Sequence, residues 1–248
     1  MHLLKRLLPS RARTPPQPEH ALAVIGDLHG RSDLLEEMIG LIAATAGTHT
    51  KLVFVGDYVD RGEDSAGVLG ILQALQTDIW PSEVICLMGN HEAMMLNFLD
   101  SPEEGADAWL NNGGGSTLAS FGIGLRDRKT PSLLRARSAL REALTARTEA
   151  WLRALPLSHR SGNILVSHAG ANPHAPLEHQ EEEYLLWGHP DFLTTPRRDS
   201  GWVAHGHWAS SQPCAENGRI SVDTGAYATH RLTAALLFGG ECRFVWTG

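Results

Sequence analysis

Three short apolar runs, each ending in glycine followed by a polar residue, constrain the fold more than any other feature of this chain. They occupy residues 21–27, 51–57 and 83–90. Between them, residues 32–46 and 65–76 carry apolar side chains at helical spacing. Strands that are apolar throughout and alternate with helices indicate a parallel sheet covered on both faces. We therefore expect an α/β fold.

The rhythm breaks after the third run. We expect a mainly helical insertion over about residues 99–160, containing a turn-rich loop, NNGGGST, at residues 111–117. Residues 163–170 again read as a strand, and short strands separated by turns follow to the C-terminus. Tryptophans outside the motifs, including Trp109, are taken as packing residues.

The first 20 residues differ from the rest in being basic and rich in proline. They lack the apolar segment and the cleavage site of a secretory signal. We expect a flexible tail over residues 1–20, followed by one domain over residues 21–248. The alternative for residues 1–13 is a weak peripheral contact with a membrane surface.

Composition excludes several classes of protein. The chain has 248 residues and a formal net charge of −7. No run approaches the roughly 20 apolar residues of a membrane span, so an integral membrane protein is excluded. Three distant cysteines without a CxxC pair suggest a reducing compartment, and we expect a cytoplasmic protein. The acidic balance argues against nucleic acid as a partner.

One stretch runs against this acidic balance. Residues 126–160 contain nine arginine and lysine residues and only three acidic ones. A solvated helix face is the leading interpretation. The alternative is a docking surface for an anionic substrate.

Polar residues next to glycine gather at the expected strand ends. Taken singly, each would be explained as a cap, a turn or a surface residue, but their recurrence on several strands indicates one shared site. Their carboxylate, imidazole and amide-oxygen donors suit divalent Mn, Fe or Zn. These residues are Asp27, His29, Asp57, Asp60, Asn90, His91, His168 and His207.

Four blocks of sequence carry a resemblance to a known family. They are GDLHG (26–30), GDYVDRG (56–62), GNHE (89–92) and HAG (168–170). They are similar to the signature blocks of the PPP-family serine/threonine protein phosphatases, within the calcineurin-like metallophosphoesterases, and look more like the bacterial branch. The resemblance extends from about residue 21 to the C-terminus. It implies a two-sheet β-sandwich flanked by helices, with the helical insertion near the active site.

The resemblance also implies two divalent metal ions, which we expect to be Mn²⁺, with Fe or Zn as alternatives. Six side chains would hold them: Asp27, His29, Asp57, Asn90, His168 and His207. Asp57 would bridge both ions, since a shared carboxylate holds two cations roughly 3.5–4 Å apart. A hydroxide activated by both ions would then attack phosphorus in line.

The same blocks imply catalytic roles for three further residues. His91 would be the general acid that protonates the leaving alkoxide. Asp60 would orient His91, and Arg61 would grip the phosphoryl oxygens together with Asn90.

One position departs from the family pattern. Many family members carry a second phosphate-binding arginine in a stretch like LLWxR, whereas this chain reads LLWGHP and places His189 there. A neutral histidine grips a dianion less well than arginine does. The phosphate pocket would therefore be weaker, or be completed by Arg197 or Arg198.

These features predict a metal-dependent phosphomonoesterase acting on a phosphoprotein or phosphopeptide. The first alternative is a diadenosine tetraphosphate hydrolase, which shares the metal blocks. The second is a catalytically inactive binding protein on the same fold. The sequence is silent on oligomeric state.

Overall fold

The three apolar runs form neighbouring parallel strands, as their pattern predicts. The computed structural model describes residues 13–248. In it these strands are β1 (Leu22–Ile25), β2 (Lys51–Phe54) and β3 (Val84–Cys86). Strand β2 lies between the other two and places Val53 opposite Val24 of β1 and Ile85 of β3. Because the strands run parallel, their carboxyl ends, with the polar residues that follow, open onto one edge of the sheet.

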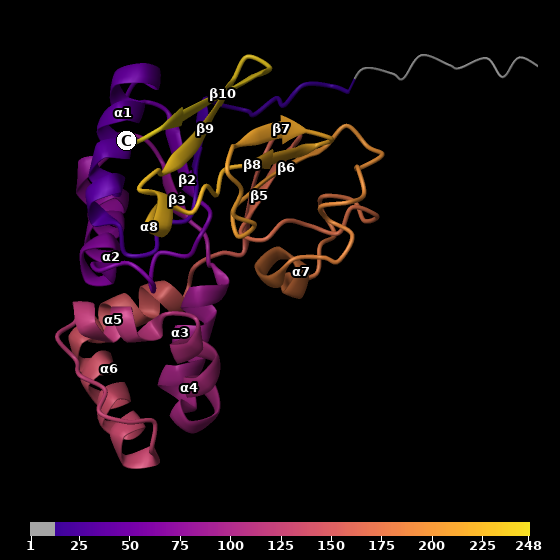
Figure 1. Cartoon of the computed structure of the whole chain (residues 1–248). Helices are drawn as coiled ribbons and strands as arrows, with labels where there is room; N and C mark the ends of the chain where they lie inside the picture. The colour runs from indigo at the N-terminus through magenta and orange to yellow at the C-terminus, as the bar shows by residue number, and fades with distance from the viewer. Residues whose placement is uncertain (1–12) are drawn as a thin grey trace, which may run out of the picture.

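Two mixed five-stranded sheets form the body of the protein (Figure 1). The other strands are β4 (Ser158–Ser161), β5 (Ile164–Ser167), β6 (Trp202–His205), β7 (Cys214–Glu216), β8 (Arg219–Ser221), β9 (Thr233–Phe238) and β10 (Glu241–Trp246). The first sheet has the order β10-β9-β1-β2-β3, and the second has the order β4-β5-β6-β8-β7. Antiparallel pairing joins β9 to β1 and β10 in the first sheet, and β4 to β5 and β7 to β8 in the second.

Side chains along the buried strands alternate between two cores. On β1, Leu22 and Val24 pack against the second sheet, in a cluster that includes Ile164 of β5. Ala23 and Ile25 point the other way, into the core beneath the helices. The strand is apolar throughout because both of its faces are buried. The expected α/β sandwich flanked by helices is confirmed.

Helices cover the outer faces of both sheets. Helices α1 (Ser32–Ala46) and α2 (Ser65–Ala74) pack on the first sheet, and a π-helical turn, Leu75–Ile79, extends α2. Two short helices, α7 (Glu182–Trp187) and α8 (Ala226–Thr229), lie in the C-terminal half. Leu185 of α7 packs with residues of the outer face of the second sheet.

Four helices follow β3 and gather beside the ends of the sheets (Figure 1). They are α3 (Asn90–Asp100), α4 (Pro102–Asn111), α5 (Gly114–Ser120) and α6 (Thr130–Arg153). The expectation of a loop over residues 111–117 is wrong, because only Asn112 and Gly113 lie outside the helices α4 and α5 there. Gly113 makes the turn with a left-handed φ of 107°, which glycine adopts without strain.

Helix α6 makes up most of the basic stretch of residues 126–160, and part of the charge of this stretch is neutralised locally. Arg141 and Arg153 bind the carboxylate of Glu149 at 2.9 and 2.8 Å, and Arg153 also lies 2.7 Å from Asp100. These partly exposed pairs fit the interpretation as a solvated helix face.

Part of the expected flexible tail is held in place. Within residues 13–19, Arg13 donates a hydrogen bond to the carbonyl of Gly201 at 2.8 Å, and Trp202 Nε1 donates to the carbonyl of Thr14 at 2.8 Å. These two contacts attach residues 13 and 14 to the chain at the start of β6. The rest of that tail, with the membrane contact expected for it, lies outside the described residues. Among residues 13–248, no helix has the length and apolar character needed to cross a bilayer.

Candidate metal centre

The motif residues converge where both sheets present the carboxyl ends of strands. The loops after β1, β2 and β3 supply Asp27, Asp57 and Asn90, and those after β5 and β6 supply His168 and His207. The site is therefore assembled by five chain segments that are distant in sequence. Its position matches the ligand site of open α/β sheets.

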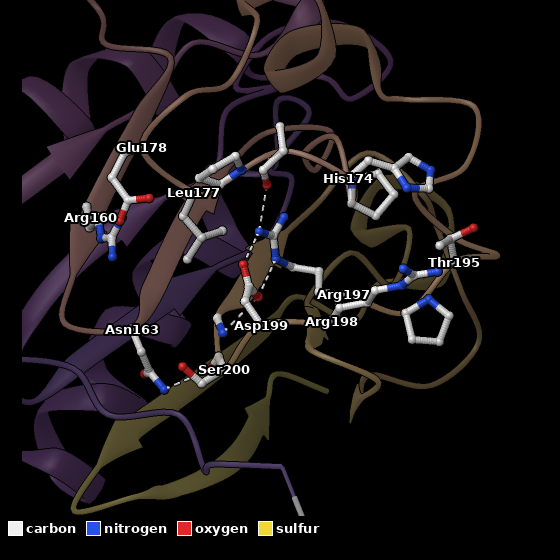
Figure 2. Close-up of a pocket in the computed structure, with 15 residues that line it drawn as sticks. Arg160, Asn163, His174, Leu177, Glu178, Thr195, Arg197, Arg198, Asp199 and Ser200 are labelled. Carbon is white, nitrogen blue, oxygen red and sulfur yellow. Dashed lines mark hydrogen bonds and ion pairs between the residues drawn. The ribbon is translucent and has the colours of Figure 1, made fainter.

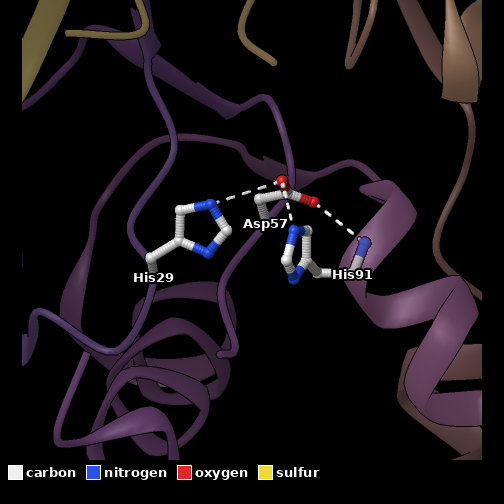
Figure 3. Close-up of side chains that lie close together, drawn as sticks. All are labelled: His29, Asp57 and His91. Atoms are coloured by element: carbon white, nitrogen blue, oxygen red, sulfur yellow. Dashed lines mark hydrogen bonds and ion pairs between the residues drawn. The ribbon is translucent and has the colours of Figure 1, made fainter. Parts of the chain in front are cut away.

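Asp57 lies at the centre of this cluster. Its Oδ2 is 3.5 Å from His29 Nε2 and 3.8 Å from His91 Nε2. Figure 3 shows this carboxylate between the two rings. Its Oδ1 is 3.4 Å from His168 Nε2. Two groups of potential ligands, one with His29 and His91 and one with His168 and His207, thus share this carboxylate. A carboxylate shared in this way has the geometry needed to bridge two cations.

A second set of donors converges beside Asp57. Asn90 Oδ1 lies 2.8 Å from His168 Nε2 and 3.0 Å from His207 Nδ1. The two imidazole nitrogens are themselves 3.1 Å apart. Nitrogen and oxygen donors that face one another this closely can be satisfied together by a cation placed among them.

The histidines are oriented and uncharged, as metal ligands must be. The Nδ1 atoms of His29 and His168 lie 2.8 and 3.1 Å from the carbonyls of Val59 and Val55, so Nδ1–H donates and Nε2 is free to bind. Burial lowers the pKa of His29 to about 3. Burial likewise lowers the pKa of His207 to about 4.

Two buried acidic side chains beside the expected ligands, Asp27 and Asp223, are costly to ionise without a cation nearby. Asp27 accepts hydrogen bonds from the backbone N–H of His207, at 3.1 Å to Oδ2. Burial raises its pKa well above the ordinary value, and the charges of Asp223 and Asp57 act in the same direction. Burial also raises the pKa of Asp223 to about 6. Divalent cations would relieve this repulsion, so the donor set fits a metal centre. Sequence reasoning missed Asp223, although it lies in the DTGAY segment.

Several of these residues have a strained backbone. A non-glycine residue with left-handed φ costs about 1 kcal/mol or more and persists only where its surroundings hold it. The values of φ range from 43° to 74° at His29, Asp57, Asp60, Arg61 and His207.

Glu92 holds the loop after β2 against the first turn of α3. Its buried carboxylate accepts backbone N–H bonds from Asp57 and Gly89 at 2.9 Å, from Tyr58 at 2.8 Å and from Val59 at 3.2 Å. Burial, and next the charge of Asp57, raise the pKa of Glu92 to about 7, while the N–H groups of Tyr58 and Val59 oppose this shift. Sequence reasoning gave Glu92 no role, although it ends the GNHE block.

A buried pair joins His91 to Asp60. His91 Nδ1 lies 2.7 Å from Asp60 Oδ2. Burial lowers the pKa of His91, but the negative charges of Asp57 and Asp60 outweigh it and raise the pKa above the ordinary value. Trp109 Nε1 and Thr117 Oγ1 donate further hydrogen bonds to Asp60. Trp109 is buried in the core, as expected of a packing residue, and its N–H also binds Asp60.

Arg61 reaches from this pair to the rim of the site. Its Nη2 lies 3.2 Å from His91 Nε2, and its Cζ lies 5.0 Å from the centre of the Tyr227 ring. Arg61, Tyr227, Arg31 and His230 are among the residues that line a hollow of about 500 Å³ beside the site.

The structure does not bring His189 to this cluster within the part of the chain that it describes. His189 Nδ1 accepts a hydrogen bond from the backbone N–H of Asp191 at 3.0 Å. The ring lies edge-on to Tyr184, with centroids 4.6 Å apart.

Arg197 does not complete a phosphate pocket beside the metal ligands either. It lies in a separate pocket of about 600 Å³, shown in Figure 2, whose lining contains none of the expected ligands. Its guanidinium binds Asp199 at 2.5 Å and the carbonyls of Asn172 and Ala175 at 3.0 and 2.8 Å. Arg198 lines the same separate pocket. The expectation that either arginine replaces the family's second one is wrong, because Arg197 is committed to shaping its own loop.

Comparison with known sequences places this geometry in context. A family model described as calcineurin-like phosphoesterase matches residues 20–233. The asymmetrical bis(5′-nucleosyl)-tetraphosphatase of Oceanobacillus iheyensis is 26% identical over 232 residues, which cover 85% of this chain and 86% of that protein. The serine/threonine-protein phosphatase 6 catalytic subunit of Caenorhabditis elegans is 39% identical over 79 residues, which cover 31% of this chain and 22% of that protein.

Solved structures share the architecture. A candidate diadenosine tetraphosphatase superposes with a TM-score of 0.63 at 22% identity, covering 94% of this chain and 96% of that one. A cold-active protein-tyrosine phosphatase of a psychrophilic Shewanella superposes with a TM-score of 0.57 at 17% identity, covering 95% and 84%. Because both sequence identities are below 25%, these superpositions show a shared fold only.

Replacing Glu92 by glutamine tests whether its carboxylate holds the site together. The amide nitrogen would face backbone N–H donors, so at least one buried donor would lose its partner. We expect Glu92→Gln to lower the free energy of unfolding of the metal-free protein by about 2 kcal/mol. Urea denaturation measures the loss, and Glu63→Gln, at an exposed position in the neighbouring loop, is the matched control. Equal stability of the two variants would contradict this role of Glu92.

Proposed function

The chain belongs to the calcineurin-like phosphoesterase family, and on that premise we propose that it is a serine/threonine protein phosphatase. It is a metallophosphoesterase, and the proposal concerns its substrate, a phosphomonoester on a protein or peptide. The observation that carries the proposal is the buried pair of His91 and Asp60 beside the shared carboxylate Asp57.

We assign the six expected ligands to two cations, with Mn²⁺ as the proposed metal. They are Asp27, His29, Asp57, Asn90, His168 and His207. When bound, the cations would withdraw charge from a phosphoryl group and make water acidic enough to attack phosphorus near neutral pH. The protein contributes a bridging carboxylate and neutral imidazoles whose N–H groups are fixed by backbone carbonyls.

His91 acts as the proton donor to the leaving group. An alkoxide from serine or threonine is a poor leaving group, so it gains most from a positioned acid. The carboxylate of Asp60 binds Nδ1, which points Nε2 toward Asp57 and the reacting atoms. A nucleotide phosphate leaving from an anhydride needs this proton much less, so an acid held this firmly favours alkyl phosphates.

Arg61 binds the phosphoryl oxygens, with Asn90 as a further polar contact. The planar guanidinium suits a dianion, and the contact with His91 places it beside the proton donor. We retain His189 as a peripheral substrate contact at most, since its Nδ1 accepts a hydrogen bond from its own loop.

A second candidate is the asymmetric cleavage of dinucleoside tetraphosphates. The coverage of the relatives favours it: the match to the Oceanobacillus iheyensis tetraphosphatase spans 86% of that protein, whereas the match to the Caenorhabditis elegans phosphatase spans 22%. Because the match to the phosphatase covers only 31% of this chain, it carries less information on the substrate.

Phosphate release from two kinds of substrate decides between the candidates. Protein stripped with EDTA and reloaded with Mn²⁺ is given phosphoserine and phosphothreonine peptides in one assay and diadenosine tetraphosphate in another. We expect turnover of the peptides with little cleavage of the dinucleotide. The reverse result would reject the protein phosphatase and establish the second candidate. Reloading with Fe²⁺ or Zn²⁺ in parallel tests the choice of metal.

Removing the proposed acid gives a signature that depends on the leaving group. We expect His91→Asn to lower kcat by about 100-fold or more on phosphoserine peptides, because the alkoxide would leave without a proton. The loss on p-nitrophenyl phosphate should be much smaller, since p-nitrophenolate leaves readily unprotonated. Steady-state kinetics on both substrates measures the difference. Equal losses would remove His91 from this role.

Removing the shared carboxylate of Asp57 should weaken the binding of metal ions at the site. We expect Asp57→Asn to bind fewer than two metal ions per chain and to lose nearly all activity on every substrate. Elemental analysis after dialysis against Mn²⁺ measures the stoichiometry. Asp33→Asn is the matched control, because Asp33 is exposed and binds Arg31 at 2.6 Å instead of facing the cluster. Full metal content in Asp57→Asn would refute the bridge.

A further inference from the structure

The carboxylate of Asp60 is held from three directions inside the protein. Oδ2 lies 2.7 Å from His91 Nδ1. Oδ1 accepts a hydrogen bond from Thr117 Oγ1 at 2.6 Å, and Trp109 Nε1 lies 3.0 Å from both oxygens. Asp60, Trp109 and Thr117 are all completely buried. Apart from His91, the side chains that donate to Asp60 are Trp109 of α4 and Thr117 of α5.

The direction of the Thr117 hydroxyl is fixed by its other neighbours. Its oxygen accepts a hydrogen bond from the backbone N–H of Asp60 at 2.8 Å and lies 3.1 Å from Ser65 Oγ. A hydroxyl has one proton and two acceptor positions. An ionised carboxylate can only accept, so the proton of Thr117 is directed to Asp60, and the second acceptor position of the Thr117 oxygen is left for the Ser65 hydroxyl.

The indole of Trp109 has equally little freedom. Its ring packs on Phe98 of α3, with centroids 4.8 Å apart. On another side it meets the backbone of Gly114, where an added Cβ would lie 2.5 Å from the ring. These contacts leave Trp109 little room to turn its N–H away from Asp60.

These donors fix the orientation of the Asp60 carboxylate plane relative to His91. A carboxylate without them could rotate about its Cβ–Cγ bond and move Oδ2 away from Nδ1. Held at both oxygens, it presents Oδ2 to His91 in one orientation, and the imidazole is fixed in turn.

We propose that Trp109 and Thr117 are positioning residues for His91, acting through Asp60. The inference rests on the proposed role of His91 as proton donor. It makes α4 and α5 part of the catalytic machinery, because they hold the carboxylate that orients the acid.

Two conservative variants test this in kinetics. Trp109→Phe and Thr117→Val keep most of the packing volume and remove the donor. We expect each to lower kcat on phosphoserine peptides by about 10-fold, with KM changed less than about twofold and p-nitrophenyl phosphate affected little. Trp151→Phe is the control, because Trp151 Nε1 donates at 2.6 Å to Gln76 and not to Asp60. Equal losses on both substrates, or an equal loss in the control, would overturn the proposal.

A double-mutant cycle shows whether the two residues act through Asp60. In an Asp60→Asn background, adding Trp109→Phe or Thr117→Val should cause no further loss of kcat, because the oriented carboxylate is already gone. Additive losses would mean that the residues act elsewhere and would reject the proposal.

A spectroscopic measurement separates this proposal from the proposed function. In protein with ¹⁵N-labelled histidine, the His91 Nδ1–H resonance reports its hydrogen bond to Asp60 without any substrate. We expect Trp109→Phe and Thr117→Val to shift this resonance and Trp151→Phe to leave it in place. If phosphopeptides are not hydrolysed but the shifts are seen, the positioning stands and the substrate assignment fails. An unshifted resonance in both variants would reject the positioning.

Discussion

The bonds from four backbone N–H groups to the carboxylate of Glu92 are the constraint on which the site depends. Asp57, Tyr58 and Val59 donate from the loop after β2, and Gly89 donates from the residue before α3. The loop needs this anchor, because Asp57 has a left-handed φ of 54°, a conformation that costs energy for a residue with a Cβ. With the loop fixed in this shape, the carboxylate of Asp57 faces the histidines of both sheets.

The glycines that precede the polar residues make this arrangement sterically possible. At Gly56, which has a φ of 109°, an added Cβ would lie 2.5 Å from the backbone nitrogen of Gly89. At Gly89 it would lie 2.2 Å from the backbone nitrogen of Asp57. The backbones of the loops after β2 and β3 thus touch directly, in addition to their hydrogen bonds through Glu92. The repeated glycine–polar pairs in the sequence are the mark of this contact, and they explain why the two motifs come together.

The sequence predicts those parts of the molecule that depend on local pattern. The apolar runs that form β1 and β2 alternate with segments of helical spacing, which suffices to indicate the α/β fold. The polar residues at the ends of these runs indicate the set of clustered donors. The roles of Trp109, Thr117 and Glu92 could not be predicted in this way, because each depends on a contact with a loop more than 30 residues away. A tryptophan in a helical pattern indicates burial but not the partner of its N–H group. The glycines at 113–115 suggested a loop, whereas Gly114 is needed for close packing against Trp109.

The charges around Arg61 bear on the size of the substrate that this site accepts. The hollow beside it is lined by the acidic residues Asp33, Glu63 and Asp64 as well as by Arg31. Arg31 is already bound to Asp33 at 2.6 Å, so it adds little free positive charge. Bound cations can neutralise the phosphoryl group that reacts, but they cannot neutralise a polyphosphate chain that extends into this hollow. A single phosphate on a neutral or basic peptide therefore suits the local charge better than a tetraphosphate does, which supports the proposed peptide substrate and the proposed role of His91 as proton donor.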